Sequence, residues 1–286
     1  MISKCFDFLI KKLGSEPRQP PEAEFSMLSG EKRRWLDSFA SQHFGYFNYL
    51  NGILSKYIGH LDARSLLDIG CGSMFPQLLL FNTMGCSRAI GVDITDFVDL
   101  NNLEPEWKYF YAKLQELTGC PLRHDGVDAR SIDITKTPFP DDFFDIIISN
   151  NVFEHISNLD EVMTEINRIS KSNAIFCIAI HSWTHLSGSH HPQVKFPVTE
   201  FPIDVKPWYH LTEAKNQSFG DLNKWRIKQY RDLFERHSEI LEWRLRFEEG
   251  KQFLTDEIRN ELEDYTEEEL LMRTIEVVAR PQKKLT

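Results

Sequence analysis

A short buried-strand pattern that runs into two closely spaced glycines is the feature that most constrains the fold of this chain. Residues Leu66–Ile69 form the strand pattern, and Gly70-Cys71-Gly72-Ser73 follows it directly. Pro76 then suits the first turn of a helix, where its missing N–H is not needed. A strand, a glycine turn and a helix in this order let a ligand approach the backbone at a helix N-terminus. The pattern therefore predicts a ligand site at the end of a buried strand.

Further strand patterns follow the glycine turn and alternate with helical stretches such as Leu159–Lys171. Continuous apolar strands that alternate with helices are typical of a parallel sheet covered on both faces. Near the end of the chain, a helical pattern over Asp221–Glu235 precedes two more strand patterns, which we expect to close the same sheet. The six later strands are expected at Ala89–Ile94, Val127–Ile134, Phe144–Ser149, Ala174–Ile180, Ile240–Phe247 and Thr274–Arg280.

The chain divides by pattern into an extension and one sheet-centred domain. Residues 1–60 are mostly helical in pattern, apart from the proline-rich stretch Gly14–Glu24, and we expect an N-terminal extension or lid. Residues 61–286 form the domain. Within it, residues 181–235 begin as an irregular stretch rich in His, Pro and Trp, which we expect to cap the site after the fifth strand.

Charge and composition limit the partners of the chain. Its 286 residues carry 43 acidic against 33 basic side chains, a formal net charge of −10, which disfavours nucleic acid as a partner. No apolar run is long enough to span a membrane, and no signal-peptide pattern is present at the start. The five cysteines include no C-x-x-C pair, so we expect reduced thiols and a cytoplasmic protein.

The glycine turn distinguishes between two kinds of nucleotide ligand. Asp93 stands 21 residues after Gly72, where a carboxylate can accept hydrogen bonds from ribose hydroxyls. A dinucleotide site needs a third glycine, but Phe75 occupies that position. Asp68 would also repel a pyrophosphate, whereas a ligand with a positively charged amino group and sulfonium tolerates it. These residues favour S-adenosylmethionine (SAM) over a dinucleotide.

Three segments together resemble the class I SAM-dependent methyltransferase superfamily. They are D-I-G-C-G-S at 68–73, G-V-D at 91–93 and P-F-P-D-D-F-F-D-I-I-I-S-N-N-V-F-E-H-I at 138–156, and the similarity covers residues 65–181. The resemblance implies an α/β, Rossmann-like, doubly wound sheet of seven strands in the order 3-2-1-4-5-7-6, with the last strand antiparallel. It also implies SAM as the methyl donor and S-adenosylhomocysteine as the product.

The same resemblance implies roles for individual residues. Gly70 and Gly72 would line the methionine part of SAM, with Asp68 directed toward its amino group, and Asp93 would hold the ribose. Asp133 would contact the adenine amino group, Ile134 would pack on the adenine, and Asn150 would lie beside the reacting methyl. The expected cofactor-binding set is Asp68, Gly70, Cys71, Gly72, Asp93, Ile94, Asp133, Ile134 and Asn150.

The methyl acceptor is expected near a concentration of histidines after the fifth strand. An alcohol acceptor needs a base, and histidine is the side chain best suited near neutral pH. His181 ends the fifth strand and is our first candidate for the base, with His155 second. Aromatic and histidine side chains suit an uncharged, planar or sugar-like acceptor. The expected substrate contacts are Trp183, His185, Trp208, Tyr209 and His210.

These residues lead to a hypothesis and several alternatives. We expect methylation of a small molecule, such as a sugar or natural-product intermediate, on oxygen rather than nitrogen. We expect no metal, because His181 and His185 have a helical zinc spacing but no helix is evident there. A non-catalytic scaffold, a nicotinamide oxidoreductase and an aminopropyl transferase on the same fold stay open. The oligomeric state is not indicated.

Overall fold

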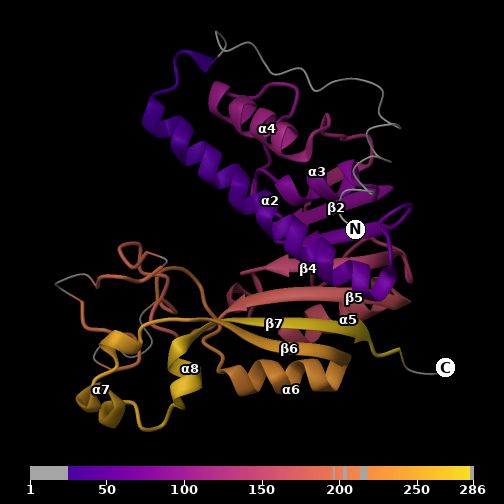
Figure 1. Cartoon of the computed structure of the whole chain (residues 1–286). Coiled ribbons are helices and arrows are strands. Elements are labelled where there is room, and N and C mark those ends of the chain that lie inside the picture. The colour runs from indigo at the N-terminus through magenta and orange to yellow at the C-terminus, as the bar shows by residue number, and fades with distance from the viewer. Residues whose placement is uncertain (1–24, 196, 202–204, 213–217, 284–286) are drawn as a thin grey trace. The chain divides into compact units, whose positions relative to one another are not determined.

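The computed structural model describes residues 25–195, 197–201, 205–212 and 218–283 (Figure 1). The first 24 residues of the expected N-terminal extension, including the proline-rich stretch Gly14–Glu24, lie outside the described residues. The chain divides into two compact units, an N-terminal unit that ends at Ile132 and a C-terminal unit that begins at Asp133.

The strands form a seven-stranded sheet in the order β3-β2-β1-β4-β5-β7-β6, which confirms the expected topology. The pairs β1–β2, β2–β3 and β4–β5 are parallel. The pairs β5–β7 and β6–β7 are antiparallel, as expected for the last strand. The strands are β1 Ser65–Ile69, β2 Arg88–Asp93, β3 Val127–Ser131, β4 Phe144–Asn150, β5 Ser170–His181, β6 Ser238–Glu248 and β7 Met272–Pro281.

The N-terminal unit combines β1, β2 and β3 with three helices, α2 Gly30–Ile58, α3 Pro76–Thr83 and α4 Pro105–Thr118. Local sequence sets their ends. The Ser29 side chain accepts a hydrogen bond from the Lys32 N–H and caps α2, and prolines begin α3 and α4. Helix α3 packs against all three strands, and α2 packs on α3 and α4. The helix expected after the glycine turn therefore begins at Pro76, as predicted.

The C-terminal unit combines β4 to β7 with helices on either side of the long irregular segment. Helix α5 (Leu159–Ile169) follows β4 after a 3₁₀ turn at Phe153–His155, and α6 (Ile227–His237) precedes β6 and packs on it. The acidic stretch between β6 and β7 forms a 3₁₀ turn and two short helices, η3 Lys251–Phe253, α7 Asp256–Glu261 and α8 Glu267–Leu271.

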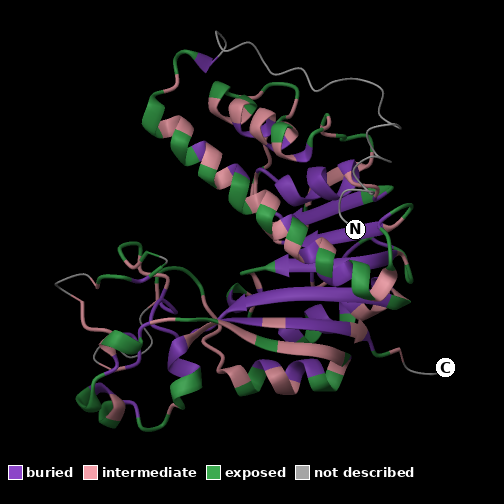
Figure 2. Cartoon of the chain, viewed as in Figure 1, coloured by how far each residue is buried: buried purple, intermediate pink, exposed green. Residues whose placement is uncertain are grey.

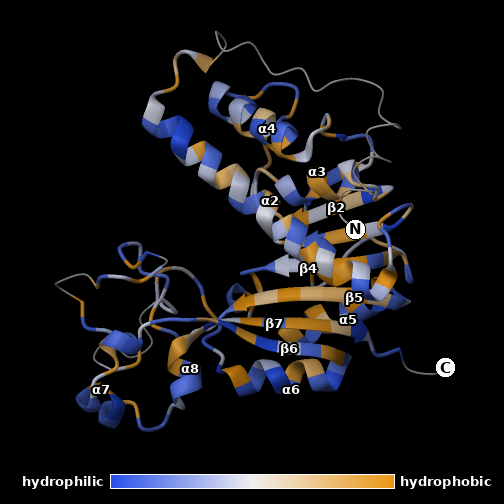
Figure 3. Cartoon of the chain, in the orientation of Figure 1, coloured by the Kyte–Doolittle hydropathy of each residue, from blue (hydrophilic) through white to orange (hydrophobic). Residues whose placement is uncertain are grey.

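The central strands of the C-terminal unit are almost entirely buried. In β4, residues Phe144–Ser149 are buried, and in β5 every residue from Ala174 to His181 is buried (Figure 2). Figure 3 shows that β5 is also strongly apolar. The run AIFCIAI therefore behaves as a strand covered on both faces, which explains why its sequence does not alternate. Among the helices that the structure describes, none has the length and hydropathy that crossing a membrane requires.

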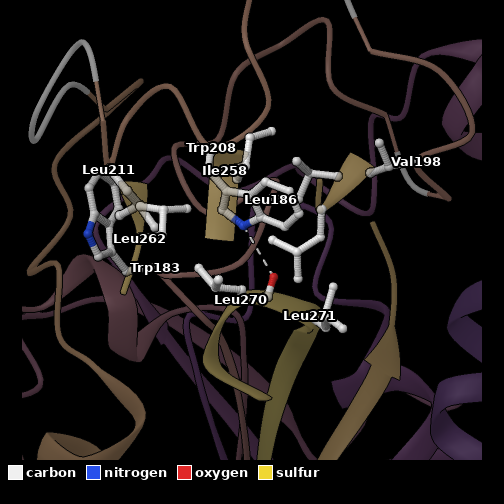
Figure 4. Close-up of a cluster of buried hydrophobic side chains, with 10 residues drawn as sticks. Trp183, Leu186, Val198, Trp208, Leu211, Ile258, Leu262, Leu270 and Leu271 are labelled. Carbon is white, nitrogen blue, oxygen red and sulfur yellow. Dashed lines mark hydrogen bonds between the residues drawn. The ribbon is translucent and has the colours of Figure 1, made fainter. Parts of the chain in front are cut away.

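The irregular segment after β5 has a hydrophobic core of its own in the C-terminal unit (Figure 4). Trp208 is completely buried, and its indole N–H donates to the Leu270 carbonyl at 3.3 Å. Leu186 is also completely buried and lies against Gly250. The other members come from the irregular segment and from the segment that holds α7 and α8. They are Trp183, Val198, Leu211, Leu254, Ile258, Leu262, Leu270 and Leu271.

Leu186→Ala tests whether this cluster stabilises the fold. Removal of a fully buried leucine leaves a cavity, so we expect the free energy of unfolding to fall by about 2–5 kcal/mol. Met27, which is 91% exposed, supplies the control, and Met27→Ala should change stability by no more than about 0.5 kcal/mol. Urea unfolding followed by circular dichroism measures both. Equal effects of the two substitutions would contradict a packed cluster.

Candidate functional site

The glycine turn in the N-terminal unit is held by the neighbouring strand β2. The N–H groups of Gly70 and Cys71 both donate to the Val92 carbonyl, at 2.8 and 3.4 Å. Gly70 and Gly72 have φ values of 72° and 68°, in the left-handed region where a side chain would cause strain. A Cβ atom added to Gly72 would meet no atom within 4 Å. The backbone at Gly72 therefore faces open space, as a ligand that approaches the turn would require.

Asp93 ties the end of β2 to this turn. Its Oδ2 accepts the N–H of Gly72 at 2.8 Å, and its Oδ1 accepts the N–H groups of Ile94 and Thr95 at 2.7 and 3.1 Å. The next residue, Ile94, is 90% exposed, which is unusual for a large apolar side chain. The turn thus presents a fixed carboxylate beside an exposed apolar side chain.

Asp68 is the buried acid of this turn. It lies in β1 beside Gly91 of β2 and is 5% exposed. Burial raises the pKa of the Asp68 carboxyl well above its usual range, and repulsion from Asp93 raises it further. Two carboxylates close enough to repel each other make this a region that favours a cationic group.

Cys71 contributes to the turn by packing. Its side chain is buried against Gly91, where an added Cβ would lie 2.5 Å from the Cys71 sulfur. Burial raises the pKa of the Cys71 thiol, so the thiolate is disfavoured. Cys71 therefore packs its side chain against β2 and is not a reactive thiol of the turn.

The remaining expected cofactor contacts lie in the C-terminal unit. Asp133 is exposed, and its Oδ1 accepts both the N–H and the hydroxyl of Thr135 at 2.9 Å, which closes a turn. Ile134 is buried. Asn150 is exposed at the end of β4, where it pairs with Ala179 of β5.

Four histidine rings form a row in the C-terminal unit. The His155 and His190 ring centres are 5.0 Å apart, His190 stacks on His181 at 4.7 Å, and His181 lies 6.2 Å from His185. The structure thus brings together His155, His181 and His185, all of which were expected to be site residues. His190, which was not among the expected residues, lies between His155 and His181 in this row. Burial is the main reason that the pKa of His181 is well below its usual range and that the pKa values of His185 and His190 fall to about 3 and about 4.

Ser187 holds two of these rings. Its hydroxyl lies 2.9 Å from His181 Nε2 and 2.9 Å from His185 Nδ1, and its backbone N–H donates to His185 Nδ1 at 3.1 Å. Gly188 makes this turn possible, because a Cβ there would lie 2.0 Å from the Trp183 carbonyl oxygen. The sequence S-G-S therefore folds the chain back so that its histidines converge.

His155 has a tautomer that its surroundings define. Its Nδ1 lies 2.8 Å from the Asp221 carbonyl, and a carbonyl oxygen only accepts, so Nδ1 carries the proton in the neutral ring. The lone pair of that neutral ring is then on Nε2. His155 is exposed, on the 3₁₀ turn after β4. It is therefore arranged as a proton acceptor that a ligand can reach.

Glu154 is a residue that the sequence analysis did not select. It is 2% exposed, and neither carboxylate oxygen makes a hydrogen bond of normal geometry. Burial raises its pKa to about 8, against smaller opposing effects from the backbone N–H groups of Glu154 and His181 and from Arg273. Glu154 and His155 are adjacent, shortly after β4, in the segment 138–156 that resembles the methyltransferase superfamily. This pair was the signal that could have identified Glu154.

Asn223 fixes the turn that carries Glu154 and His155. Its side-chain amide donates to the Phe153 and Ile156 carbonyls at 2.7 and 2.9 Å, and its Oδ1 accepts the Tyr230 hydroxyl at 2.8 Å. Its backbone N–H donates to the Glu154 carbonyl at 2.8 Å. The segment that precedes α6 therefore positions the histidine row, a role that the sequence pattern did not indicate.

The expected aromatic substrate contacts are mostly packed against protein. Trp183 and Trp208 belong to the hydrophobic cluster described above, and His210 is fully buried with its Nε2 donating to the Trp183 carbonyl at 3.0 Å. Tyr209 is 8% exposed, and its hydroxyl is buried without a hydrogen-bond partner. In this structure Trp208 has no exposed surface for a ligand, so the visible role of its ring is packing.

Comparison with known proteins gives a family match over the central part of the chain. Residues 67–178 match the family model described as a methyltransferase domain. A sterol 24-C-methyltransferase of Gibberella zeae is 25% identical over 157 residues, which are 52% of this chain and 37% of that protein. The chain therefore matches little more than a third of the length of that curated relative.

Solved structures are similar at low sequence identity. A protein named PH0226 from Pyrococcus horikoshii is 17% identical with a TM-score of 0.48, over 84% of this chain and 91% of that one. A SAM-dependent methyltransferase from Mesorhizobium loti is 14% identical with a TM-score of 0.46, over 80% and 96%. Geranyl diphosphate C-methyltransferase from Streptomyces coelicolor is 13% identical with a TM-score of 0.47, over 82% and 77%.

The family match covers the glycine turn, Asp93 and β4, and the strand order is the one that the resemblance implied. The sheet is therefore that of a Rossmann-like methyltransferase fold, and residues 67–178 match the methyltransferase domain family.

Proposed function

We propose that this protein binds SAM and transfers its methyl group to a small-molecule acceptor. The observation that carries the proposal is the link between Asp93 and Gly72. A carboxylate at a strand end accepts the N–H of a left-handed glycine whose outer side is open, within the segment that matches the methyltransferase family. The curated relative supports a transferase, since its name gives it methyl transfer to a sterol carbon.

Asp68, Asp93 and Ile94 supply complementary groups for the parts of SAM. The charge of Asp68 suits the amino group of the methionine moiety, and the Asp93 carboxylate suits the ribose hydroxyls. The exposed side chain of Ile94 offers apolar surface to a flat base. We further propose that Asp133, Ile134 and Asn150 contact the cofactor, as the family resemblance implies.

The acceptor is proposed to be an alcohol or phenol, with His155 as the general base. Support comes from its lone pair at Nε2 and from its exposure, whereas His181 is buried and bonded to Ser187. His181 remains the candidate that the sequence favoured. In the reaction, the acceptor oxygen forms a bond to the methyl carbon while the carbon–sulfur bond breaks. S-adenosylhomocysteine leaves, and the acceptor proton passes to His155.

Asp93→Ala is expected to weaken SAM binding by about 1–3 kcal/mol, because the cofactor loses a charged hydrogen-bonding partner. Isothermal titration calorimetry with SAM and with S-adenosylhomocysteine measures the loss. Asp93→Asn keeps one acceptor oxygen for the turn and should lose less. Asp125→Ala is the matched control, since that exposed acid pairs with Arg123 in the same unit. No binding of either ligand to the wild type would overturn the proposal.

SAM binding should strengthen as the pH rises through the raised pKa of Asp68. A bound ammonium group favours the carboxylate form, so binding below that pKa requires Asp68 to release a proton. Asp68→Asn should remove this pH dependence and weaken binding at neutral pH. Because the ionised form of a buried acid with a raised pKa destabilises the fold, Asp68→Asn should unfold at an equal or higher temperature. Calorimetry over a pH series and thermal unfolding measure both effects. An unchanged pH dependence in Asp68→Asn would refute this role.

His155→Gln should slow methyl transfer by about 10²–10⁴-fold and leave SAM affinity unchanged, as expected for loss of a general base. Release of S-adenosylhomocysteine with a panel of alcohols, phenols and amines measures turnover, and mass spectrometry of the product identifies the methylated atom. His237→Gln is the control, because His237 pairs with Asp160 on another part of the C-terminal unit. Full activity of His155→Gln would exclude it as the base.

The same assays distinguish the other candidates. A scaffold would bind SAM but give no turnover with any acceptor. An aminopropyl transferase would consume decarboxylated SAM and a polyamine. A nicotinamide oxidoreductase would be protected by NAD against thermal unfolding. A product methylated on carbon would contradict the proposed O-methylation and would agree with the reaction that the name of the curated relative gives.

A further inference from the structure

Glu154, His181 and His190 form a compact group of potential ligands in the C-terminal unit. One ligand atom from each residue lies within 4.8 Å of the other two. The residues come from three places in the chain, the 3₁₀ turn after β4, the last position of β5 and the segment that follows Gly188. Two imidazoles and one carboxylate are a common set of ligands for catalytic zinc and for other divalent transition metals.

The carboxylate of Glu154 is an independent sign that a partner belongs here. A buried carboxylate normally has hydrogen bonds or a paired charge, because burial without them is costly. Glu154 is 98% buried, yet both of its oxygens lack a hydrogen bond of normal geometry. Arg273 acts on it electrostatically and lowers its pKa, but this effect is smaller than that of burial. A metal ion would supply the missing contact.

The two histidines have features expected of ligands. A metal-binding histidine usually fixes its ring through a hydrogen bond at the other nitrogen, and His181 Nε2 lies 2.9 Å from the Ser187 hydroxyl, which leaves its other nitrogen to coordinate. His190 has a φ of 58°, a left-handed conformation that strains a histidine. Such strain is often kept where a side chain must point into a functional site.

We propose that Glu154, His181 and His190 bind one divalent metal ion of the zinc class. Tetrahedral ligand atoms about 2.1 Å from zinc are about 3.4 Å apart, so the widest pair must close by at most about 1.4 Å. His190 is only partly buried and lies on an irregular segment, so it is the ligand best able to make that movement. Three protein ligands leave a fourth position open to water or to an oxygen of the acceptor.

This site gives a reason for oxygen methylation, a step that rests on the proposed function. A hydroxyl group bound at the open position loses its proton more readily, because the cation stabilises the alkoxide. The proton passes to His155 Nε2. The alkoxide oxygen then bonds to the methyl carbon of SAM as the carbon–sulfur bond breaks, and S-adenosylhomocysteine leaves. His181 acts in this scheme as a ligand and not as the base.

Metal binding is tested on the full-length protein after treatment with a chelator. Titration with Zn²⁺ by calorimetry and with Co²⁺ by visible absorption should show one ion per chain in the wild type. Glu154→Gln and His190→Asn should each weaken binding by more than about 100-fold, and Ser187→Ala by about 10–100-fold. Asparagine suits position 190 because it tolerates the left-handed backbone. His124→Ala removes an exposed histidine of the other unit and should bind like the wild type.

The outcomes separate this proposal from the methyltransferase proposal. Circular dichroism shows whether each variant is folded, and SAM calorimetry on the metal-free protein shows whether the cofactor site works alone. Zinc binding that Glu154→Gln and His190→Asn abolish supports the site even if SAM does not bind. SAM binding by a wild type that takes up no zinc or cobalt overturns the metal site only. Equal zinc affinity in His190→Asn and the wild type overturns it as well.

Discussion

The Asp93 carboxylate holds together the part of the N-terminal unit on which the family signature depends. It accepts three backbone N–H groups, one from the glycine turn and two from the chain just after β2. Together with the bonds from Gly70 and Cys71 to the Val92 carbonyl, they hold the left-handed turn and leave the outer side of Gly72 open. The buried Asp68 beside it has a raised pKa, so a cationic ligand would favour its ionised form and would be favoured by it in return. The glycines allow the left-handed backbone of the turn, and Asp68 and Asp93 favour a cationic ligand over an anionic one.

In the C-terminal unit, polar side chains are buried next to the apolar strand β5. β5 ends at His181, and the chain then turns sharply at Ser187 and Gly188. The hydrophobic cluster around Trp208 includes residues of this segment and gives it a core of its own. A buried row of imidazoles is costly unless hydrogen bonds or ligands compensate for the lost water. Ser187 provides part of that compensation for His181 and His185, and the nearby Glu154 carboxylate has no hydrogen-bond partner.

Much of the fold could be predicted because its signals are local. The strand at Ala174–Ile180 follows from an unbroken apolar run, the start of α3 at Pro76 follows from proline chemistry, and the order of the strands followed from the family resemblance. The limits of the prediction are also informative. The third strand was expected to reach Ile134 but ends at Ser131, because Asp133 closes a turn with Thr135 through its side chain. The aromatic residues of the cap were expected to face a substrate, yet Trp208 lies wholly inside the hydrophobic cluster. Composition cannot tell which side of a tryptophan-rich segment faces inward.

The sequence by itself determined the parallel sheet, the glycine turn with its acids and the concentration of histidines after β5, since each depends on residues that are neighbours in the chain or on strand periodicity. Only the tertiary structure decided which histidines meet, and that Glu154 joins them. His181 and His185 have the spacing of a metal-binding pair on a helix, but the segment forms a turn, and His190 stacks on His181 instead. The tautomer of His155 depends on a carbonyl 66 residues away. Long-range contacts of this kind arise when separate segments pack into one core. They cannot be predicted from a local sequence pattern.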